Sequence, residues 1–375
     1  MKTKILERSE LNKSIAVVVG TRPGIIKFSP VIRELARRKA DFFVIHTGQH
    51  YSYNMDKTFF EDLELPAPRF KNDNICNFTT HGGQTAEMIK GVEAACIEAK
   101  PAVVIVGGDA NTNLAAALAV RKLVCIILAH MEAGLRSLDW QMPEEHNRVM
   151  IDHISEVLLA PTKQAMDNLN RENVKGQIFY TGNTIVDAVQ QNFLLAQKKS
   201  TILEDLGPGR YALLTTHREE NVDHKDRLES LLTALVRIKP EFGLNLVFPC
   251  HPRTQERLRQ FGLNKRVEGI PSLKMIKAVG YLDFLLLMAK ADIVLTDSGG
   301  IQEETCILKV PCVTIRDSTE RPETLELGSN FIAGTDPDMI LAGMRKMLSV
   351  ERQWANPFGD GHAAKRIVDV LMNYL

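Results

Sequence analysis

The chain has 375 residues, of which 45% are hydrophobic and 25% are charged, as in an ordinary globular enzyme that is large enough for two domains. Lys plus Arg and Asp plus Glu number 46 each, so no overall positive field favours nucleic acid or an anionic membrane as a partner. The six cysteines lack paired CxxC spacing, which favours reduced thiols over a disulfide framework. No run approaches the about 18 apolar residues of a membrane span, and residues 1–13 lack the apolar core of a signal peptide. We therefore expect a cytoplasmic protein.

Short β-branched runs alternate with amphipathic helical segments, such as Phe28–Arg38 and Gln84–Ala99, along the whole chain. Continuous apolar strands separated by helices are typical of parallel sheets that are covered on both faces. In the first half the pattern predicts strands at Ser14–Gly20, Phe42–His46, Ala102–Val106, Val124–Ala129, Glu156–Ala160 and Gln177–Thr181. After Gly182 it begins again and predicts strands at Tyr211–Thr216, Leu244–Pro249, Asp292–Thr296, Pro311–Ile315 and Asn330–Ala333.

This repetition predicts two doubly wound α/β domains. We place the first at residues 1–184 and the second at residues 185–360, with the boundary near Thr184–Ala188. The segment Asn356–Gly361 (NPFGDG) is rich in turn-forming residues, and a helix is predicted after it at Ala363–Leu375. We expect this helix, within residues 361–375, to return to the first domain.

The segment Asp292–Glu304 (DIVLTDSGGIQEE) has the pattern of a strand, a tight turn and a helix. In open α/β sheets, ligands bind beyond the carboxyl ends of the strands. Gly299 and Gly300 allow backbone N–H groups to approach a ligand closely, and the start of the helix adds partial positive charge, so the turn suits a phosphate or diphosphate. Glu304, about one turn into the helix, is then placed to bind the hydroxyls of a ribose. An ordinary strand-to-helix turn is the alternative.

The first domain offers polar side chains at the ends of three predicted strands. Arg22 and Lys27 lie near a helix start after the first strand, a composition that favours a diphosphate over a solvated basic turn. Asp109 follows two glycines at the end of the third strand, where a plain turn is the alternative. Glu132 follows a strongly apolar run (VCIILA), so we expect it to be partly buried with a raised pKa, as in a proton carrier. In the second domain, His217 ends a strand and is offered to the ligand from that side.

Ten short segments occur in order along nearly the whole chain. They are GTRPGIIK (20–27), GGD (107–109), HMEAGLR (130–136), PEEHNR (143–148), TGNTIVDA (181–188), THREEN (216–221), HPR (251–253), DSGGIQEE (297–304), TERPE (319–323) and NPFGDG (356–361). Together they resemble the non-hydrolysing UDP-N-acetylglucosamine 2-epimerases, and ten such segments at the family's spacing are very specific. The resemblance implies a glycosyltransferase-B-like fold, in which two Rossmann-like domains face a central cleft and the second domain holds most of the UDP.

The resemblance also implies substrate-binding residues. They are Ser298, Gly299 and Gly300 for the diphosphate, Glu304 for the ribose hydroxyls, Phe284 beside the uracil, and Arg22, Lys27 and Arg321 around the phosphates.

The family's acid–base and leaving-group residues correspond to Asp109, Glu132, Glu144 and His217. Two neighbouring positions depart from the family pattern. Gly24 stands where Glu is common after Arg-Pro, and Ala110 stands where Thr is common after Gly-Asp. These departures bear on the activity and on the exact sugar more than on the fold.

The implied reaction is the reversible epimerisation of UDP-N-acetylglucosamine to UDP-N-acetylmannosamine. In this family, UDP leaves C1 as the C2–H bond breaks, and it adds back to the resulting 2-acetamidoglucal while C2 is reprotonated on the opposite face. Two faces need two proton carriers, which explains several carboxylates in one site. No redox cofactor is required, and no metal is expected, because cations and helix-start amides supply the positive potential. Family members are typically homodimers, so we expect a homodimer.

Four alternatives use the same fold. A UDP-sugar glycosyltransferase would need one base and an open acceptor groove, which the acid-rich first domain argues against. An epimerase could instead act on a modified UDP-2-acetamido sugar. A hydrolytic relative would release UDP and free N-acetylmannosamine, and a nucleotide-sugar sensor would bind without turnover.

Overall fold

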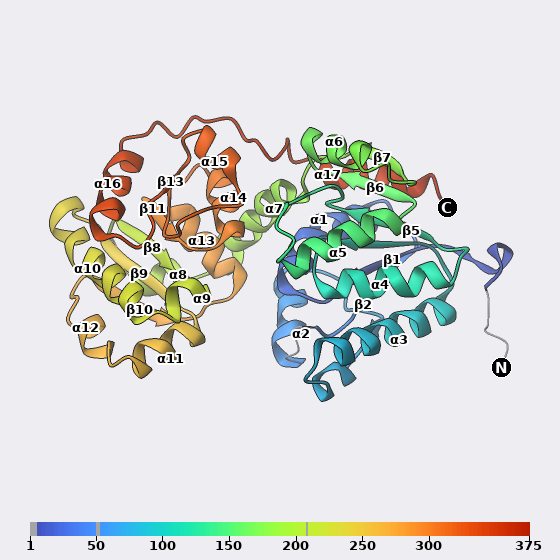
Figure 1. Ribbon diagram of the computed structural model, residues 1–375, viewed down its shortest axis with the longest axis horizontal. Coiled ribbons are helices and arrows are strands. Elements are labelled where there is room, and N and C mark those ends of the chain that lie inside the picture. The colour runs from blue at the N-terminus through green and yellow to red at the C-terminus, as the bar shows by residue number, and fades with distance from the viewer. Residues whose placement is uncertain (1–5, 50–52, 208) are drawn as a thin grey trace. The chain divides into compact units, whose positions relative to one another are not determined.

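The computed structural model describes residues 6–49, 53–207 and 209–375 (Figure 1). The chain divides into two compact units, which are Met1–Gln191 with Phe358–Leu375, here the N-terminal unit, and Asn192–Pro357, here the C-terminal unit. Each contains one parallel sheet with helices between successive strands, which confirms the predicted pair of doubly wound α/β domains. The division between Gln191 and Asn192 falls within one helix, α7 (Thr184–Lys199).

The N-terminal unit has a seven-stranded sheet of order β3-β2-β1-β4-β5-β6-β7. Its strands are β1 (Asn12–Val19), β2 (Phe42–His46), β3 (Phe70–Lys71), β4 (Pro101–Gly107), β5 (Ile127–Met131), β6 (Val157–Ala160) and β7 (Gln177–Tyr180). Its helices, besides α7, are α1 (Arg22–Arg37), α2 (Tyr53–Asp62), α3 (His81–Ala99), α4 (Asn111–Lys122), α5 (Pro143–Ile154), α6 (Lys163–Arg171) and α17 (Ala363–Met372). Two short 3-10 helices lie at Arg8–Glu10 and Asn74–Asn77.

Alternate residues of β1 face opposite sides of this sheet, as the pleat requires. Ala16 and Val18 belong to the core that α3 and α4 cover, while Ile15 and Val17 are equally buried on the side of α1. The helices α3, α4 and α5 lie side by side across one face (Figure 1). Burial on both faces explains why the strands read as continuous apolar runs.

The C-terminal unit has a six-stranded sheet of order β10-β9-β8-β11-β12-β13. Its strands are β8 (Tyr211–Thr215), β9 (Asn245–Cys250), β10 (Leu273–Lys277), β11 (Ile293–Thr296), β12 (Cys312–Thr314) and β13 (Asn330–Ile332). Its helices are α8 (Ile202–Leu206), α9 (Glu219–Val222), α10 (Lys225–Phe242), α11 (Pro252–Gln260), α12 (Asn264–Glu268), α13 (Tyr281–Lys290), α14 (Gly299–Leu308), α15 (Pro322–Glu326) and α16 (Pro337–Leu348). The helices α10 and α16 pack together over the main core of this unit.

Every predicted strand is present, but two strands were not predicted and one begins three residues later than expected. Both unpredicted strands, β3 and β10, lie at sheet edges. Edge strands need no continuous apolar run, and β10 contains two exposed lysines, Lys274 and Lys277. The strand predicted from Val124 begins at Ile127, because Val124 is 69% exposed and has a left-handed backbone with φ 60°.

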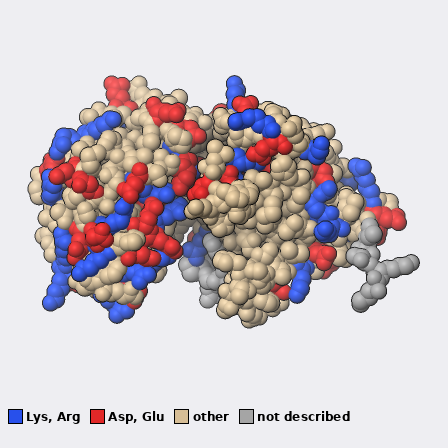
Figure 2. Space-filling model, in the orientation of Figure 1, with Lys and Arg blue, Asp and Glu red and all other residues tan. Residues whose placement is uncertain are grey.

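Charges of both signs are mixed on the face of the C-terminal unit that Figure 2 shows, in keeping with the balanced composition. Within the described ranges, no helix is both long enough and apolar enough to cross a membrane.

The helix α17 returns to the N-terminal unit, packs on α1 and is anchored by Asp187 of α7. The two carboxylate oxygens of Asp187 accept the backbone N–H groups of Ala363 (3.2 Å) and Ala364 (3.0 Å), at the start of α17. A side chain from another helix therefore does the work of an N-cap.

We expect Asp187→Ala to destabilise the N-terminal unit by about 1–2 kcal/mol, because two buried N–H groups lose their acceptor. The matched control is Asp338→Ala, which removes an 83% exposed carboxylate from the first turn of α16 and should cost less than about 0.5 kcal/mol. Denaturant unfolding of both variants measures the difference. Equal midpoints would mean that Asp187 does not anchor α17.

Candidate active site

Each sheet has one position where the strand order reverses, and the predicted site residues follow the strands at these positions. In the N-terminal unit β1 lies between β2 and β4, and in the C-terminal unit β8 lies between β9 and β11. The connections leave to opposite sides at such a point, which opens a crevice at the carboxyl ends of the strands. Arg22 and Lys27 follow β1, Asp109 follows β4, and His217 follows β8.

Lys27 and Glu132 form an ion pair in the N-terminal unit, with Nζ 2.6 Å from Oε1. Glu132 follows β5 directly and is 6% exposed, which confirms the predicted burial. The ammonium group of Lys27 compensates for the hydration that the carboxylate loses. Glu132 also has φ 67°, a left-handed conformation that a residue with a side chain adopts at a cost. Such strain is concentrated at functional positions in proteins.

Asp109 is held by Arg148 of α5, which donates through Nη2 to its Oδ2. Burial by itself would raise the pKa of Asp109, but the hydrogen bond and charge of Arg148, together with the charge of Lys27, hold that pKa below its usual range. Asp109 is therefore an ionised carboxylate at neutral pH. Arg148 also bonds Glu145 (2.5 Å), whose carboxylate accepts the backbone N–H groups of Ser137 and Leu138.

Gly108 directly precedes Asp109 and lies close to the carboxylate of Glu132, so this position requires a residue without a side chain. Its φ is 82°, and a Cβ on it would come within 3.0 Å of Glu132 Oε2. The structure thus brings Lys27, Asp109 and Glu132 to one place at the end of the N-terminal sheet.

The two remaining residues predicted in this unit occupy helix starts. Arg22 is the first residue of α1, whose N-cap Thr21 accepts the N–H of Gly24. Glu144 is an exposed residue in the first turn of α5, next to the buried Glu145. Glu144 is exposed, and Arg22 is half-buried.

Asp297 organises the corresponding end of the C-terminal sheet. It is fully buried, and its carboxylate accepts the hydroxyl of Thr216 (2.7 Å) and the backbone N–H groups of His217 (3.0 Å) and Arg218 (3.0 Å). His217 Nδ1 lies 3.5 Å from Asp297 Oδ1, so its ring is fixed beside this carboxylate. Asp297 therefore ties the turn after β8 to the turn after β11.

The start of α14 presents the predicted phosphate turn. Ser298 is the N-cap residue, and within the described part of the chain its side chain makes no capping hydrogen bond. A Cβ on Gly300 would meet no described atom within 4 Å, so the backbone there faces open space. First-turn N–H groups of a ten-residue helix, beside an unused hydroxyl, form an arrangement that suits an anion.

The other predicted ligand residues of this unit lie on α13, on α14 and beside α15. Glu304 of α14 is buried and accepts the hydroxyl of Tyr281 (3.2 Å) from α13, the helix that also carries the half-buried Phe284. Arg321, at the N-cap of α15, donates through Nε to Glu303 (2.6 Å). These contacts bring α13, α14 and the start of α15 together.

Two further residues of these sites were not predicted from the sequence. Arg148 and Asp297 lie inside the segments PEEHNR and DSGGIQEE, in which only neighbouring residues were assigned a role. No sequence pattern marks a buried acid that accepts backbone N–H groups. Asp297 could therefore have been predicted only by asking which side chain stabilises the turn after β8.

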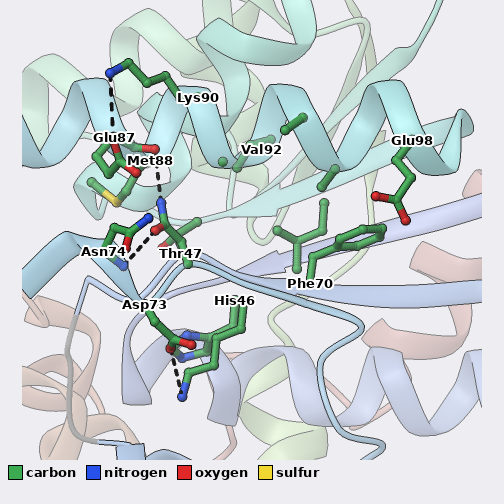
Figure 3. Close-up of a pocket in the computed structure, with 16 residues that line it drawn as sticks. His46, Thr47, Phe70, Asp73, Asn74, Glu87, Met88, Lys90, Val92 and Glu98 are labelled. Atoms are coloured by element: carbon green, nitrogen blue, oxygen red, sulfur yellow. Dashed lines mark hydrogen bonds and ion pairs between the residues drawn. The ribbon is translucent and has the colours of Figure 1, made fainter.

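The structure also has a cavity of about 550 Å³ between α3 and the ends of β2 and β3 (Figure 3). Thr47, Phe70, Glu87 and Met88 are among its lining residues, and none of the predicted site residues is. Among the described residues, no group of three or more His, Cys, Asp or Glu side chains is arranged to hold a metal ion.

The model of one protein family, described as UDP-N-acetylglucosamine 2-epimerase, matches residues 33–372. This chain belongs to that family. A UDP-N-acetylglucosamine 2-epimerase of Methanococcus maripaludis is 50% identical over 95% of this chain and 98% of its own. A UDP-2,3-diacetamido-2,3-dideoxy-D-glucuronate 2-epimerase of Pseudomonas aeruginosa is 37% identical over 95% of this chain and 99% of its own.

The crystal structure of the Methanocaldococcus jannaschii UDP-GlcNAc 2-epimerase in complex with UDP-GlcNAc and UDP is similar throughout. It has a TM-score of 0.84 and 47% identity, and the match covers 96% of this chain and 99% of that one. Family membership and this similarity confirm the glycosyltransferase-B-like fold class.

We expect His217 to titrate below its usual pKa of about 6.5. Burial, first, and the charge of Arg218 lower its pKa, while Asp297 opposes them in part. At a pH between the lower pKa of His217 in the folded protein and its higher pKa in the unfolded chain, the unfolded chain binds more protons. The free energy of unfolding should therefore fall as the pH falls below about 6.5. Proton NMR of the histidine Hε1 signals over pH measures the value, with His217→Gln for assignment. Asp297→Asn should lower it further, and a midpoint above that of the denatured chain would contradict the expectation.

Proposed function

We propose that this protein interconverts UDP-N-acetylglucosamine and UDP-N-acetylmannosamine by inverting C2 of the sugar. The observation that carries the proposal is the 50% identity, over 95% of the chain, to a UDP-N-acetylglucosamine 2-epimerase. The clustering of Lys27, Asp109 and Glu132 at one sheet end supports it, because inversion at a poorly acidic carbon needs closely placed proton carriers.

In the proposed reaction, one carboxylate takes the C2 proton as UDP leaves C1, which gives a 2-acetamidoglucal. Asp109 suits the role of acceptor, since the pKa that Arg148 and Lys27 hold low keeps it ionised. UDP then adds back to C1 while a second carrier, Glu132 or Glu144, protonates C2 from the opposite face. The steps exchange one proton and one leaving group with no net redox change, so the proposal requires no redox cofactor.

The C-terminal unit would hold UDP in this proposal. The diphosphate would bind at the start of α14 through Ser298, Gly299 and Gly300, where the N–H groups and the helix dipole favour negative charge. Arg321, with Arg22 and Lys27, would add positive charge, and His217 would assist the departure of UDP. Glu304 would bind the ribose hydroxyls, and Phe284 would lie beside the uracil.

A modified sugar is the second candidate substrate. It is favoured by the 37% identity to an epimerase of a diacetamido glucuronate sugar. The departures at Gly24 and Ala110 adjoin the proposed phosphate and acid–base residues, so they are the first positions to test for sugar preference. Glycosyl transfer is disfavoured, because that reaction gives no role to a second proton carrier.

We also propose that the protein works as a homodimer in a reducing compartment, the cytoplasm. Cys96, Cys250 and Cys312 are free and buried, and burial raises the pKa of each thiol, which keeps them unreactive. The resemblance to the family supports the dimer, and light scattering of the purified protein at several concentrations tests it.

Incubation with UDP-N-acetylglucosamine in deuterated water, followed by proton NMR, tests the reaction. We expect a mixture of the two UDP sugars, with deuterium at C2 of both. Epimerisation without exchange would contradict proton transfer with solvent, and free N-acetylmannosamine would indicate the hydrolytic alternative. If the substrate is unchanged, the same assay with a UDP-2,3-diacetamido sugar separates a modified-sugar epimerase from a sensor.

Substitutions should separate the two proposed roles. Asp109→Asn, Glu132→Gln and Glu144→Gln should each lower kcat by about 10²–10⁴-fold and leave UDP affinity within several-fold, because they act at the sugar. Ser298→Ala and Glu304→Ala should mainly weaken UDP binding, measured by calorimetry. If Glu132→Gln weakened UDP binding and left kcat intact, Glu132 would have a supporting role instead.

A further inference from the structure

His130 is a fully buried histidine whose two ring nitrogens both face acceptors. Nδ1 lies 2.6 Å from Asp152 Oδ1, and Nε2 lies 3.1 Å from the backbone carbonyl oxygen of Gly108. A neutral imidazole carries one N–H and can donate to only one of these oxygens. The doubly protonated ring donates to both. The geometry thus favours the imidazolium form.

The charges around the ring favour the same form. Asp152 also accepts from Arg136 (2.8 Å) and from the N–H of Gly134 (3.0 Å), and Arg136 binds Glu172 through Nε (2.7 Å) and Nη2 (2.5 Å). With His130 protonated, two cations face two carboxylates and the cluster is neutral. Burial by itself would raise the pKa of Asp152, but the charges of His130 and Arg136 hold it low.

The acceptor of the second N–H is the residue before Asp109. Gly108 has φ 82° and no side chain, and a Cβ on it would lie 3.0 Å from Glu132 Oε2. Its own N–H donates to Met131 (3.0 Å), and its carbonyl accepts from His130. Asn147 donates to the carbonyl of Asp109 itself (2.8 Å). The backbone carbonyls of Gly108 and Asp109 are therefore both fixed by side chains. They adjoin the Asp109 carboxylate, which in the proposed reaction takes the proton from C2.

We propose that His130 is a positioning residue, held as a buried imidazolium by Asp152, whose Nε2–H fixes the Gly108 carbonyl and thereby aims the Asp109 carboxylate at the sugar. The inference rests on the proposed function of Asp109. It predicts that the bond to Gly108 affects the chemical step and that the bond to Asp152 affects mainly stability.

Two substitutions separate these bonds. An Asn side chain can place its N–H₂ group near the position of Nδ1, and a Gln side chain can place it near that of Nε2. His130→Asn therefore keeps a donor for Asp152 and loses the one for Gly108, while His130→Gln does the reverse. Both lose the ring and its charge. His153→Gln is the control, since His153 is partly exposed and lies 3.7 Å from Glu172 in the same network.

We expect His130→Asn to lower kcat by about 10²-fold, as a small misplacement of a reacting group does, with KM and UDP affinity within several-fold. His130→Gln should keep at least about tenfold more of kcat than His130→Asn, and the control should match the unsubstituted protein. The thermal unfolding midpoint should fall further in His130→Gln, which loses the donor for Asp152, than in His130→Asn, which keeps it. Equal kcat values in those two variants would overturn the proposal, because a merely structural role affects both alike.

A nitrogen-15 NMR spectrum of the histidine rings tests the protonation state in the unsubstituted protein. At pH 7.5 the signals that disappear in His130→Gln should show two protonated nitrogens, and one unprotonated nitrogen would overturn the imidazolium assignment. This measurement does not depend on turnover. If the unsubstituted protein epimerises neither UDP sugar, the proposed function fails while the spectrum still decides the state of His130.

Discussion

A carboxylate can be buried only if other groups replace its hydration. This constraint applies to the acidic residues at the carboxyl ends of both sheets. For two acids of the N-terminal unit these groups are cations: Lys27 compensates Glu132, and Arg148 compensates Asp109. For Asp297 of the C-terminal unit they are mainly backbone N–H groups and a hydroxyl. Glu132 and Asp109 therefore lie beside ammonium and guanidinium groups, and Asp297, which joins two turns, is held mainly by the backbone.

The two solutions suit two different tasks. An ion pair such as Lys27 with Glu132 can be rearranged, because the flexible lysine side chain lets the ammonium group turn toward another anion. The bonds to Asp297 join the turn after β8 to the turn after β11, two strands that pair directly, so this acid keeps the shape of both turns. The first arrangement can be rearranged, and the second provides a fixed frame.

The fold could be predicted well because the strands of both sheets are buried on both faces and must be apolar. The positions that escaped prediction are those where burial is incomplete: β3 and β10 at the edges, and Val124, which turns outward on a left-handed backbone. For the sites, the motifs gave candidate ligand-binding groups, whose roles stay predictions. They did not identify the groups that hold those in place, such as His130 and Asp152, because support by a distant residue depends on tertiary contacts that spacing along the chain does not encode.

The return of α17 to the N-terminal unit also constrains how the chain folds during synthesis. Ile367, Val368 and Leu371 complete a core that α1 begins, yet the ribosome makes them after the entire C-terminal unit. All strands of the C-terminal unit are therefore synthesised while the N-terminal unit still lacks α17. Until α17 is made, the apolar side of α1 that it covers stays exposed. Translation speed through the C-terminal unit sets how long that surface stays exposed to chaperones and to other nascent chains.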